Sequence, residues 1–164
     1  MTPESDLPPD QEAALGAFLA WLQGPAANGC FVLRGYAGTG KTYLAMRLLA
    51  LADQAGLCWT VVAPTHKAVA VLQRQLERAR LKPTWYPSTL HRLLRLKLRR
   101  ERDLERCEET AQTALALEHL GLVLIDEASM VDSQLLEITL RAAHPFQTRL
   151  VFVGDPAQLP PVGE

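Results

Sequence analysis

The sequence has few of the features that mark a secreted, metal-binding or membrane protein. It contains only three cysteines, and Cys30, Cys58 and Cys107 form neither a C-x-x-C pair nor a metal-ligand spacing. We expect them to be small buried side chains in a reducing compartment. No apolar run reaches transmembrane length, and the Pro- and acid-rich N-terminus is unlike a signal peptide. These absences predict a soluble cytoplasmic protein that does not bind a membrane.

The chain also lacks a strong net charge, which is -1 at pH 7, so the total composition does not indicate a nucleic-acid-binding protein. Hydrophobic residues make up 48% of its 164 residues. That proportion predicts a buried core, and the length is that of one domain. Neither an internal repeat nor a low-complexity tract is found.

One glycine-rich segment fills every position of the pattern G-x-x-x-x-G-K-[ST]. Its residues are Gly35, Tyr36, Ala37, Gly38, Thr39, Gly40, Lys41 and Thr42. Glycines allow backbone N–H groups to close around a phosphate, while Lys41 reaches the β- and γ-phosphates and Thr42 ligates Mg²⁺. An apolar run at 30–33 precedes the loop and a helical stripe follows it. The segment therefore predicts a site for a nucleoside triphosphate.

Short apolar runs alternate with amphipathic segments along the chain. We expect strands at 30–33, 59–63, 122–125 and 150–153, and helices capped by Asp10, Thr65 and Asp132. The inward residues of these helices are expected to be Leu15, Phe18, Leu19 and Leu22; then Ala68, Val71, Leu72, Leu76 and Ala79; then Leu136, Leu140 and Ala143. The alternation predicts an α/β fold, a parallel sheet covered by helices on both faces. Polar clusters follow each strand, at the edge where such sheets bind ligands.

Two adjacent carboxylates, Asp126 and Glu127, follow the apolar run at 122–125 and form a Walker B pattern. Asp126 is expected to hold Mg²⁺ together with Thr42, and Glu127 to orient the attacking water. The alternative is a solvated acidic turn.

Two glutamines are weaker candidates on their chemistry alone. Gln158 in the Pro-rich loop after 150–153 is placed to bond a γ-phosphate or water, and Gln11 offers the donor and acceptor that match adenine. An ordinary loop and a surface glutamine are the alternatives.

Two polar clusters suggest nucleic-acid contacts. Pro64, Thr65, His66 and Lys67 open a helix whose N-terminal amides suit a phosphate, and Thr89 and His91 form a second cluster of the same kind. A capped, half-buried imidazole is the alternative for His66. Trp85 and Tyr86 are candidate stacking platforms, with core packing or a lid as the alternative.

The segment from His91 to Glu109 is dense in charge, with seven of the 17 Lys and Arg residues between Arg92 and Arg106. Leucines alternate with basic residues at 94–99, which favours a strand with one basic face. We expect an inserted hairpin that turns at 102–103, although a charged helix fits almost as well.

In order, these segments resemble the first motor domain of a superfamily 1 DNA helicase, and more closely the RecD-like and Dda-like branch. The matching stretches are Leu7–Gln11 with Ala14 (motif Q), Gly35–Thr42 (I), Ala63–Ala68 (Ia), Ser88–Leu94 (Ib), Leu124–Met130 (II) and Val153–Pro161 (III).

The resemblance implies a RecA-like P-loop NTPase fold and ATP hydrolysis coupled to 5′→3′ stepping along single-stranded DNA. It assigns Gln11 to adenine, Gln158 to the γ-phosphate, and Pro64, Thr65, His66, Lys67, Thr89 and His91 to the DNA strand. It also implies a division into a flexible arm (1–9), an ATP-binding domain (10–90 and 119–164) and a pin-like insertion (91–118).

Two departures from the family pattern shape the functional expectation. The sequence ends after motif III, so the second RecA-like domain, with its γ-phosphate arginines, is expected to be absent. No aromatic residue lies between Arg92 and Glu118 to stack on a splitting base pair. We expect these residues alone to bind Mg-nucleotide and hydrolyse ATP weakly. The alternatives are an ATP-switched module that docks a protein partner through 91–109, or another P-loop NTPase.

Overall fold

The computed structural model of the chain describes residues 9–25, 30–34 and 41–154. Its elements are α1 (Pro9–Gln23), β1 (Cys30–Arg34), α2 (Lys41–Gln54), β2 (Trp59–Ala63), α3 (His66–Ala79), β3 (Ser88–Thr89), α4 (Leu90–Leu93), β4 (Lys97–Glu101), β5 (Leu104–Glu108), η2 (Thr113–Leu115), β6 (Leu122–Ile125), η3 (Ala128–Met130), α5 (Ser133–Ala143), η4 (His144–Phe146) and β7 (Arg149–Gly154). No helix in the described ranges is long and apolar enough to cross a membrane.

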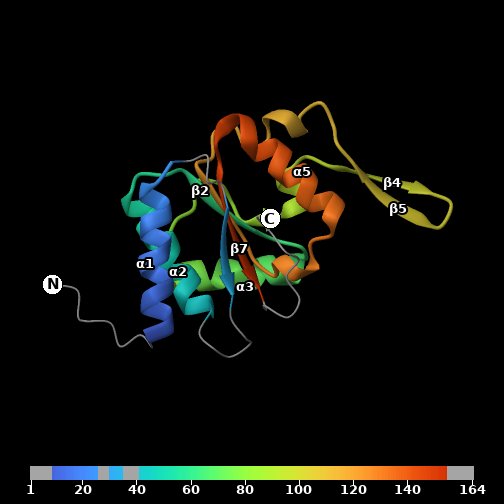
Figure 1. Cartoon of the computed structure of the whole chain (residues 1–164). Helices are drawn as coiled ribbons and strands as arrows, with labels where there is room; N and C mark the ends of the chain where they lie inside the picture. The colour runs from blue at the N-terminus through green and yellow to red at the C-terminus, as the bar shows by residue number, and fades with distance from the viewer. Residues whose placement is uncertain (1–8, 26–29, 35–40, 155–164) are drawn as a thin grey trace.

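Five strands form one parallel sheet in the order β1-β7-β6-β2-β3. Successive strands of this sheet are joined through helices, and β7, the last strand described, lies between β1 and β6 (Figure 1). This arrangement confirms the predicted α/β fold with a parallel sheet.

Helices cover both faces of the sheet, and the strand residues alternate between the two layers. Leu122 and Leu124 of β6 pack in the cluster that contains residues of α1, α2 and α3, whereas Val123 and Ile125 pack in the cluster that contains residues of α4 and α5. All four side chains are buried. This explains the continuous apolar run, because a central parallel strand has no solvent face.

The helix starts follow the predicted caps at two of three positions. Thr65 Oγ1 accepts a hydrogen bond from the N–H of Ala68 (3.2 Å), and Asp132 Oδ1 accepts one from the N–H of Leu135 (2.7 Å). The third prediction is wrong, because α1 begins at Pro9 and so includes Asp10.

The predicted inward faces of the helices need correction. Leu19, Val71 and Leu140 are 37%, 40% and 36% exposed, and Ala79 is also exposed. The predicted burial of Phe18, Leu72, Leu76 and Ala143 is confirmed. The buried residues that the prediction missed are Val69 in α3 and Leu135, Ile138, Thr139 and Ala142 in α5. An apolar stripe wider than the contact leaves its margin in water.

The charged segment forms the predicted hairpin rather than a helix. β4 and β5 pair antiparallel around a turn at 102–103, and they project away from the sheet (Figure 1). Ion pairs join Arg99 to Glu108 (3.3 Å) and Arg100 to Glu105 (3.0 Å). The strand begins at Lys97 rather than residue 94.

The projecting part is narrower than the predicted insertion at 91–118. Leu94 and Leu117 are fully buried in the same core cluster as α5, so both ends of that segment belong to the domain body. The backbone of Arg95 (φ 58°) is left-handed between the core and the hairpin.

The three cysteines are free thiols, but they are less buried than predicted. Cys58 is exposed, whereas Cys30 and Cys107 are half-buried. Burial raises the pKa of both half-buried thiols.

Candidate nucleotide and nucleic-acid site

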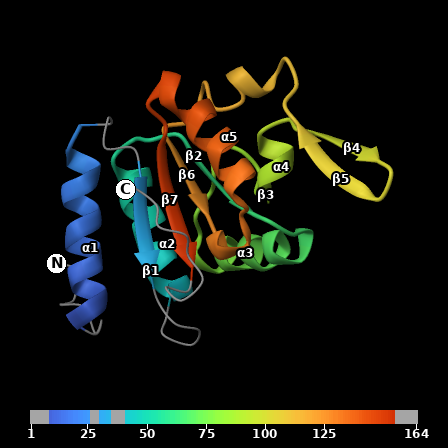
Figure 2. The same ribbon diagram turned by 45° about the vertical axis from the view of Figure 1, so that its right-hand side comes forward.

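The predicted site residues follow strands whose carboxyl ends share one edge of the sheet (Figure 2). The register places Arg34 of β1 beside Gly154 of β7, and Ile125 of β6 beside Phe152 of β7. Since neighbouring strands are about 4.8 Å apart, the ends of β1 and β6 are separated by about 10 Å across β7. A triphosphate with its metal ion is long enough to span that distance.

Of the predicted phosphate-binding segment at 35–42, only the backbone of Lys41 and the whole of Thr42 are described. β1 ends at Arg34 and α2 begins at Lys41, so the predicted strand-loop-helix order is present. Thr42 is exposed in the first turn of α2. The candidates Gly35, Tyr36, Ala37, Gly38, Thr39 and Gly40, the side chain of Lys41, and Gln158 lie outside the described residues. The start of a helix of this length suits an anion through its unpaired N–H groups.

The two predicted acidic residues differ in environment. The N–H of Asp126 donates to the carbonyl of Val62 (2.9 Å), which ties the end of β6 to β2. Asp126 is half-buried, whereas the Glu127 side chain is exposed. The Glu127 backbone is left-handed, with φ 50° and ψ 43°. The two carboxylates thus differ in burial, which suits the separate roles predicted for them.

The described residues contain no cluster of three His, Cys, Asp or Glu side chains that could hold a metal ion. Mg²⁺ in nucleotide sites usually takes only one or two protein oxygens and fills its shell with phosphates and water. Asp126 and Thr42 offer a carboxylate and a hydroxyl, which are the hard oxygen donors that such a site requires. The donor set therefore fits a nucleotide-bound Mg²⁺.

The first predicted DNA-binding cluster lies at the start of α3. His66 and Lys67 are exposed, and Pro64 is half-buried. The Thr65 hydroxyl oxygen caps the helix and retains its own proton as a donor. This arrangement leaves one basic side chain, one imidazole and one hydroxyl donor facing water at the ligand edge.

The second cluster is more enclosed than its predicted role suggests. Thr89 is 8% exposed, and its hydroxyl oxygen accepts from the N–H of Arg92 (3.3 Å) as the cap of α4. His91 is half-buried. Thr89 therefore has a clear structural role, while His91 keeps part of its surface in solvent.

Gln11 is half-buried in α1, and this helix packs against β1 and α2. The packing is aromatic: the rings of Phe18 and Phe31 are 5.4 Å apart, and the ring of Trp21 lies 5.5 Å from that of Phe31.

Arg149 helps to position α1, a role that the sequence does not reveal. Its guanidinium donates to the carbonyls of Trp21 (2.9 Å) and Gly24 (2.7 Å) and lies 5.3 Å from the Trp21 ring. It thereby fixes the C-terminal end of α1 to β7. An arginine at the start of a strand carries no sequence signal for such a contact across more than 120 residues.

Comparisons with known proteins agree with this geometry. The family model of the AAA domain matches residues 6–164. The RecBCD enzyme subunit RecD of Mycolicibacterium smegmatis is 39% identical over 150 residues, which cover 81% of this chain and 26% of that protein. The ATP-dependent RecD2 DNA helicase of Deinococcus radiodurans is 34% identical over 139 residues, which cover 84% of this chain and 17% of that protein.

A solved structure of Bacteroides sp Pif1 in complex with ADP-AlF4 is 25% identical, with a TM-score of 0.59 over 98% of this chain and 35% of that chain. The chain thus spans 26% and 17% of the lengths of the two curated relatives. The sheet with its helices on both faces is of the RecA-like type, and the resemblance seen in the motifs is confirmed. The chain therefore belongs to the AAA domain family, as a motor domain of the RecD-like superfamily 1 type.

Proposed function

We propose that the chain is the ATP-binding half of an ATP-dependent helicase or translocase that acts on single-stranded DNA in the 5′→3′ direction. The observation that carries the proposal is the shared sheet edge, where the predicted phosphate-binding segment, the acidic pair and the start of α3 follow β1, β6 and β2 of one parallel sheet. A similar protein is named an ATP-dependent DNA helicase, which supports the assignment. Nucleotide use follows from the family.

The nucleotide is held by the residues that connect β1 to α2. Backbone amides of Gly35–Gly40 surround the β-phosphate, Lys41 neutralises the β- and γ-phosphate oxygens, and Gln11 on α1 bonds the adenine edge. The Thr42 hydroxyl and the Asp126 carboxylate hold Mg²⁺. When bound, this ion neutralises charge that develops on the phosphate oxygens.

Glu127 positions the water that attacks the γ-phosphorus. Its exposed side chain supports this role, because a residue that orients water must be accessible to solvent. Gln158 reports the presence of the γ-phosphate from the loop after β7. Phosphoryl transfer depends mainly on positioning and charge stabilisation, so these two residues require accurate placement more than a shifted pKa.

The DNA strand crosses the same edge. Lys67 and the Thr65 hydroxyl bind a phosphate at the start of α3, where the helix dipole also favours an anion. His66 stacks on a base, and His91 and the Pro64–Thr65 backbone complete the contact. Thr89 contributes by holding α4.

A polypeptide of residues 1–164 is expected to hydrolyse ATP slowly. In the family pattern, the arginines that complete the γ-phosphate site lie on a second RecA-like domain, which is the expected partner of this one. Lack of such an arginine costs about 10³–10⁵ in rate in related P-loop sites.

The test is steady-state ATP turnover by the 164-residue chain with and without a single-stranded oligonucleotide, with Glu127→Gln as the blank. Stimulation by DNA supports a strand-sensing motor half. Bound nucleotide without turnover supports a motor half whose arginines come from the partner domain. Failure to bind both nucleotide and DNA, or robust unwinding by this chain alone, contradicts the proposal.

A second candidate is an ATP-switched module that docks a protein partner. It is favoured by the hairpin tip and base, where Leu98 and Leu104 are 56% and 64% exposed. Single-strand affinity at several salt concentrations separates the two functions, since phosphate contacts weaken steeply as salt rises. Docking would be favoured by an affinity for a protein partner that is insensitive to salt and that is lost only when 97–108 is replaced by a short turn.

A further inference from the structure

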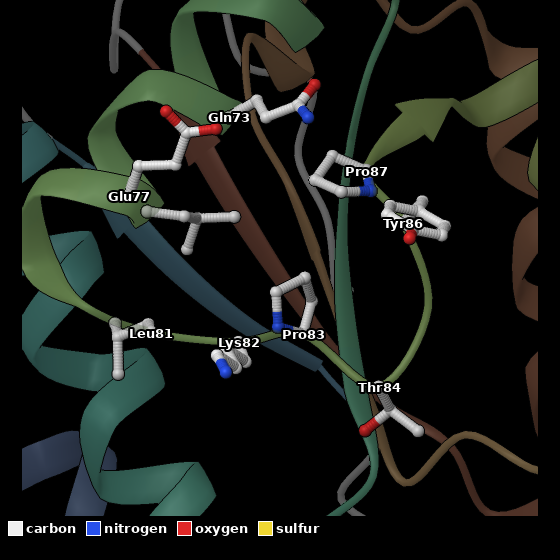
Figure 3. Close-up of a pocket in the computed structure, with 9 residues that line it drawn as sticks. Gln73, Glu77, Leu81, Lys82, Pro83, Thr84, Tyr86 and Pro87 are labelled. Carbon is white, nitrogen blue, oxygen red and sulfur yellow. The ribbon is translucent and has the colours of Figure 1, made fainter.

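A groove of about 400 Å³ lies between α3 and the chain that leads from this helix into β3. Figure 3 shows Gln73 and Glu77 of α3 on one side of it and Tyr86 and Pro87 on the other. Leu76 and Lys82 also line it. The nucleotide roles and the first DNA contacts use none of these residues.

Tyr86 is the most exposed large hydrophobic side chain in the described part of the chain, at 88%. This excludes the core-packing alternative for its ring. The backbone beside it is fixed: the N–H of Thr84 donates to the carbonyl of Trp59 (2.8 Å), and the hydroxyl of Thr60 donates to the carbonyl of Trp85 (2.8 Å). Pro87 further restricts the chain. An exposed ring on a restrained backbone loses little entropy when a flat ligand stacks on it.

A stripe of positive charge runs along α3 next to the groove. Lys67, Arg74 and Arg78 are exposed and spaced seven and four residues apart, so they share one side of the helix over about 16 Å. Arg80 and Lys82 continue the charge beyond the helix end. No ion pair among the described residues involves any of these five side chains.

The stripe links this groove to the expected DNA contact, because Lys67 belongs both to the stripe and to that contact. Glu77 is the single acidic residue between 64 and 100. A basic stripe beside an exposed aromatic ring matches single-stranded nucleic acid, whose phosphates pair with cations while its bases stack. An apolar protein partner would not require five cations that form no ion pair, so it would leave this charge unexplained.

We propose that the groove is a second contact for single-stranded nucleic acid, in which a base stacks on Tyr86 and the adjoining phosphates bind Arg74, Arg78 and Lys82. The proposal deepens the proposed function and rests on it: the strand that crosses the start of α3 continues along the helix into the groove. Glu77 weakens this contact by repelling the phosphates.

The stacking is tested by the affinity of the 164-residue chain for a fluorescent thymidine oligonucleotide. Tyr86→Ala is expected to weaken binding about 5- to 150-fold, the range for loss of one base–aromatic stack. Tyr86→Phe keeps the ring and should bind like the unchanged chain. Because Tyr86 is almost fully exposed, both variants should remain folded, which circular dichroism checks.

The charge stripe is tested by the salt dependence of the same affinity. Arg74→Gln with Arg78→Gln should lower the slope of log affinity against log salt by about 1.4, since each single-strand phosphate contributes about 0.7. Arg141→Gln, which removes one positive charge from α5 in the other helix layer, is the control and should leave the slope unchanged. Glu77→Gln should tighten binding.

A His66→Ala variant separates failure of this inference from failure of the proposed function. If His66→Ala weakens binding and Tyr86→Ala does not, the groove is not a contact and the motor assignment stands. If the groove variants weaken binding and His66→Ala does not, the groove is supported and the assignment of His66 is wrong. If the unchanged chain shows no salt-dependent affinity, both proposals fall. Photocrosslinking of an iodouracil-substituted strand to Tyr86 would support the contact directly.

Discussion

At the scale of single residues, Glu127 combines a candidate catalytic side chain with a left-handed backbone. The left-handed conformation costs free energy for any residue that has a Cβ atom, so it persists only where the surrounding structure imposes it. The N–H of Met130 donates to the carbonyl of Glu127 (3.0 Å), and the N–H of Asp126 is held by Val62, so both sides of the reversal are fixed. This geometry supports a role for Glu127 that depends on its position.

We expect Lys41→Ala and Glu127→Gln to fail at different steps. Lys41→Ala removes the cation at the phosphates, so nucleotide binding should be lost. Glu127→Gln keeps the shape of the side chain but not its charge, so nucleotide should still bind while turnover stops. Fluorescent-nucleotide titration and phosphate release measure the two steps. Equal loss of binding in both variants would contradict the role of Glu127.

The cysteines should react in an order set by exposure. Cys58 is exposed, whereas burial raises the pKa of Cys30, and burial with the nearby charges of Asp132 and Glu105 raises that of Cys107. Only the thiolate reacts, so iodoacetamide near pH 8 should label Cys58 first, and labelling of the other two should rise only at higher pH. Peptide mass spectrometry measures the order. Early labelling of Cys30 or Cys107 would contradict these environments.

At the scale of elements, the attachment of α1 depends on a contact from the far end of the chain. The last carbonyls of a helix have no partner within it, and Arg149 of β7 bonds two carbonyls at this end, those of Trp21 and Gly24. The helix that carries Gln11 is thus fixed to the central sheet by a charged side chain as well as by its aromatic contacts.

We therefore expect Arg149→Met to destabilise the fold by about 2–3 kcal/mol, since it removes two charge-assisted hydrogen bonds. The Trp21 carbonyl keeps its bond from the N–H of Gly24 (3.1 Å). Urea unfolding measures this loss. Arg141→Met is the control: its pairs with Glu109 and Glu137 are exposed, so its cost should be within about 1 kcal/mol. A smaller effect at Arg149 than at Arg141 would show that the aromatic contacts alone hold α1.

The elements also show what the sequence can and cannot predict. The buried strand 122–125 and the caps Thr65 and Asp132 were predictable because each depends on neighbouring residues. The rotation of α3, which buries Val69 and exposes Val71, depends on where the sheet lies and is not encoded locally. The exposure of Cys58 and the anchor at Arg149 likewise depend on distant partners.

The candidate site follows the same division. The pattern from Gly35 to Thr42 and the pair Asp126–Glu127 predict chemistry because their spacing matches a known phosphate site. The burial of Thr89 was not predictable, since a Thr before a short helix looks the same whether its surroundings are solvent or core. The ends of the projecting hairpin could not be predicted from the sequence, because Leu94 continues the leucine alternation but is part of the core.

At the scale of the whole molecule, the nucleotide would join parts that the chain contributes separately. In the proposed site its phosphates would contact the connection from β1 to α2, its metal ion would contact the end of β6, and its base would contact α1. Binding to the folded state alone stabilises it by mass action, by about 2.7 kcal/mol when the ligand is at a hundred times its Kd.

Saturating Mg-ADP should therefore raise the Tm of the chain by about 5–10 °C, given about 2–4 °C per kcal/mol at this size. Differential scanning fluorimetry measures the shift. Removal of Mg²⁺ with EDTA should reduce the shift, because Asp126 and Thr42 then lose the ion that connects them to the nucleotide. Lys41→Ala should abolish the shift. A shift that survives Lys41→Ala would place the nucleotide elsewhere, since a ligand away from the phosphate segment gains nothing from that lysine.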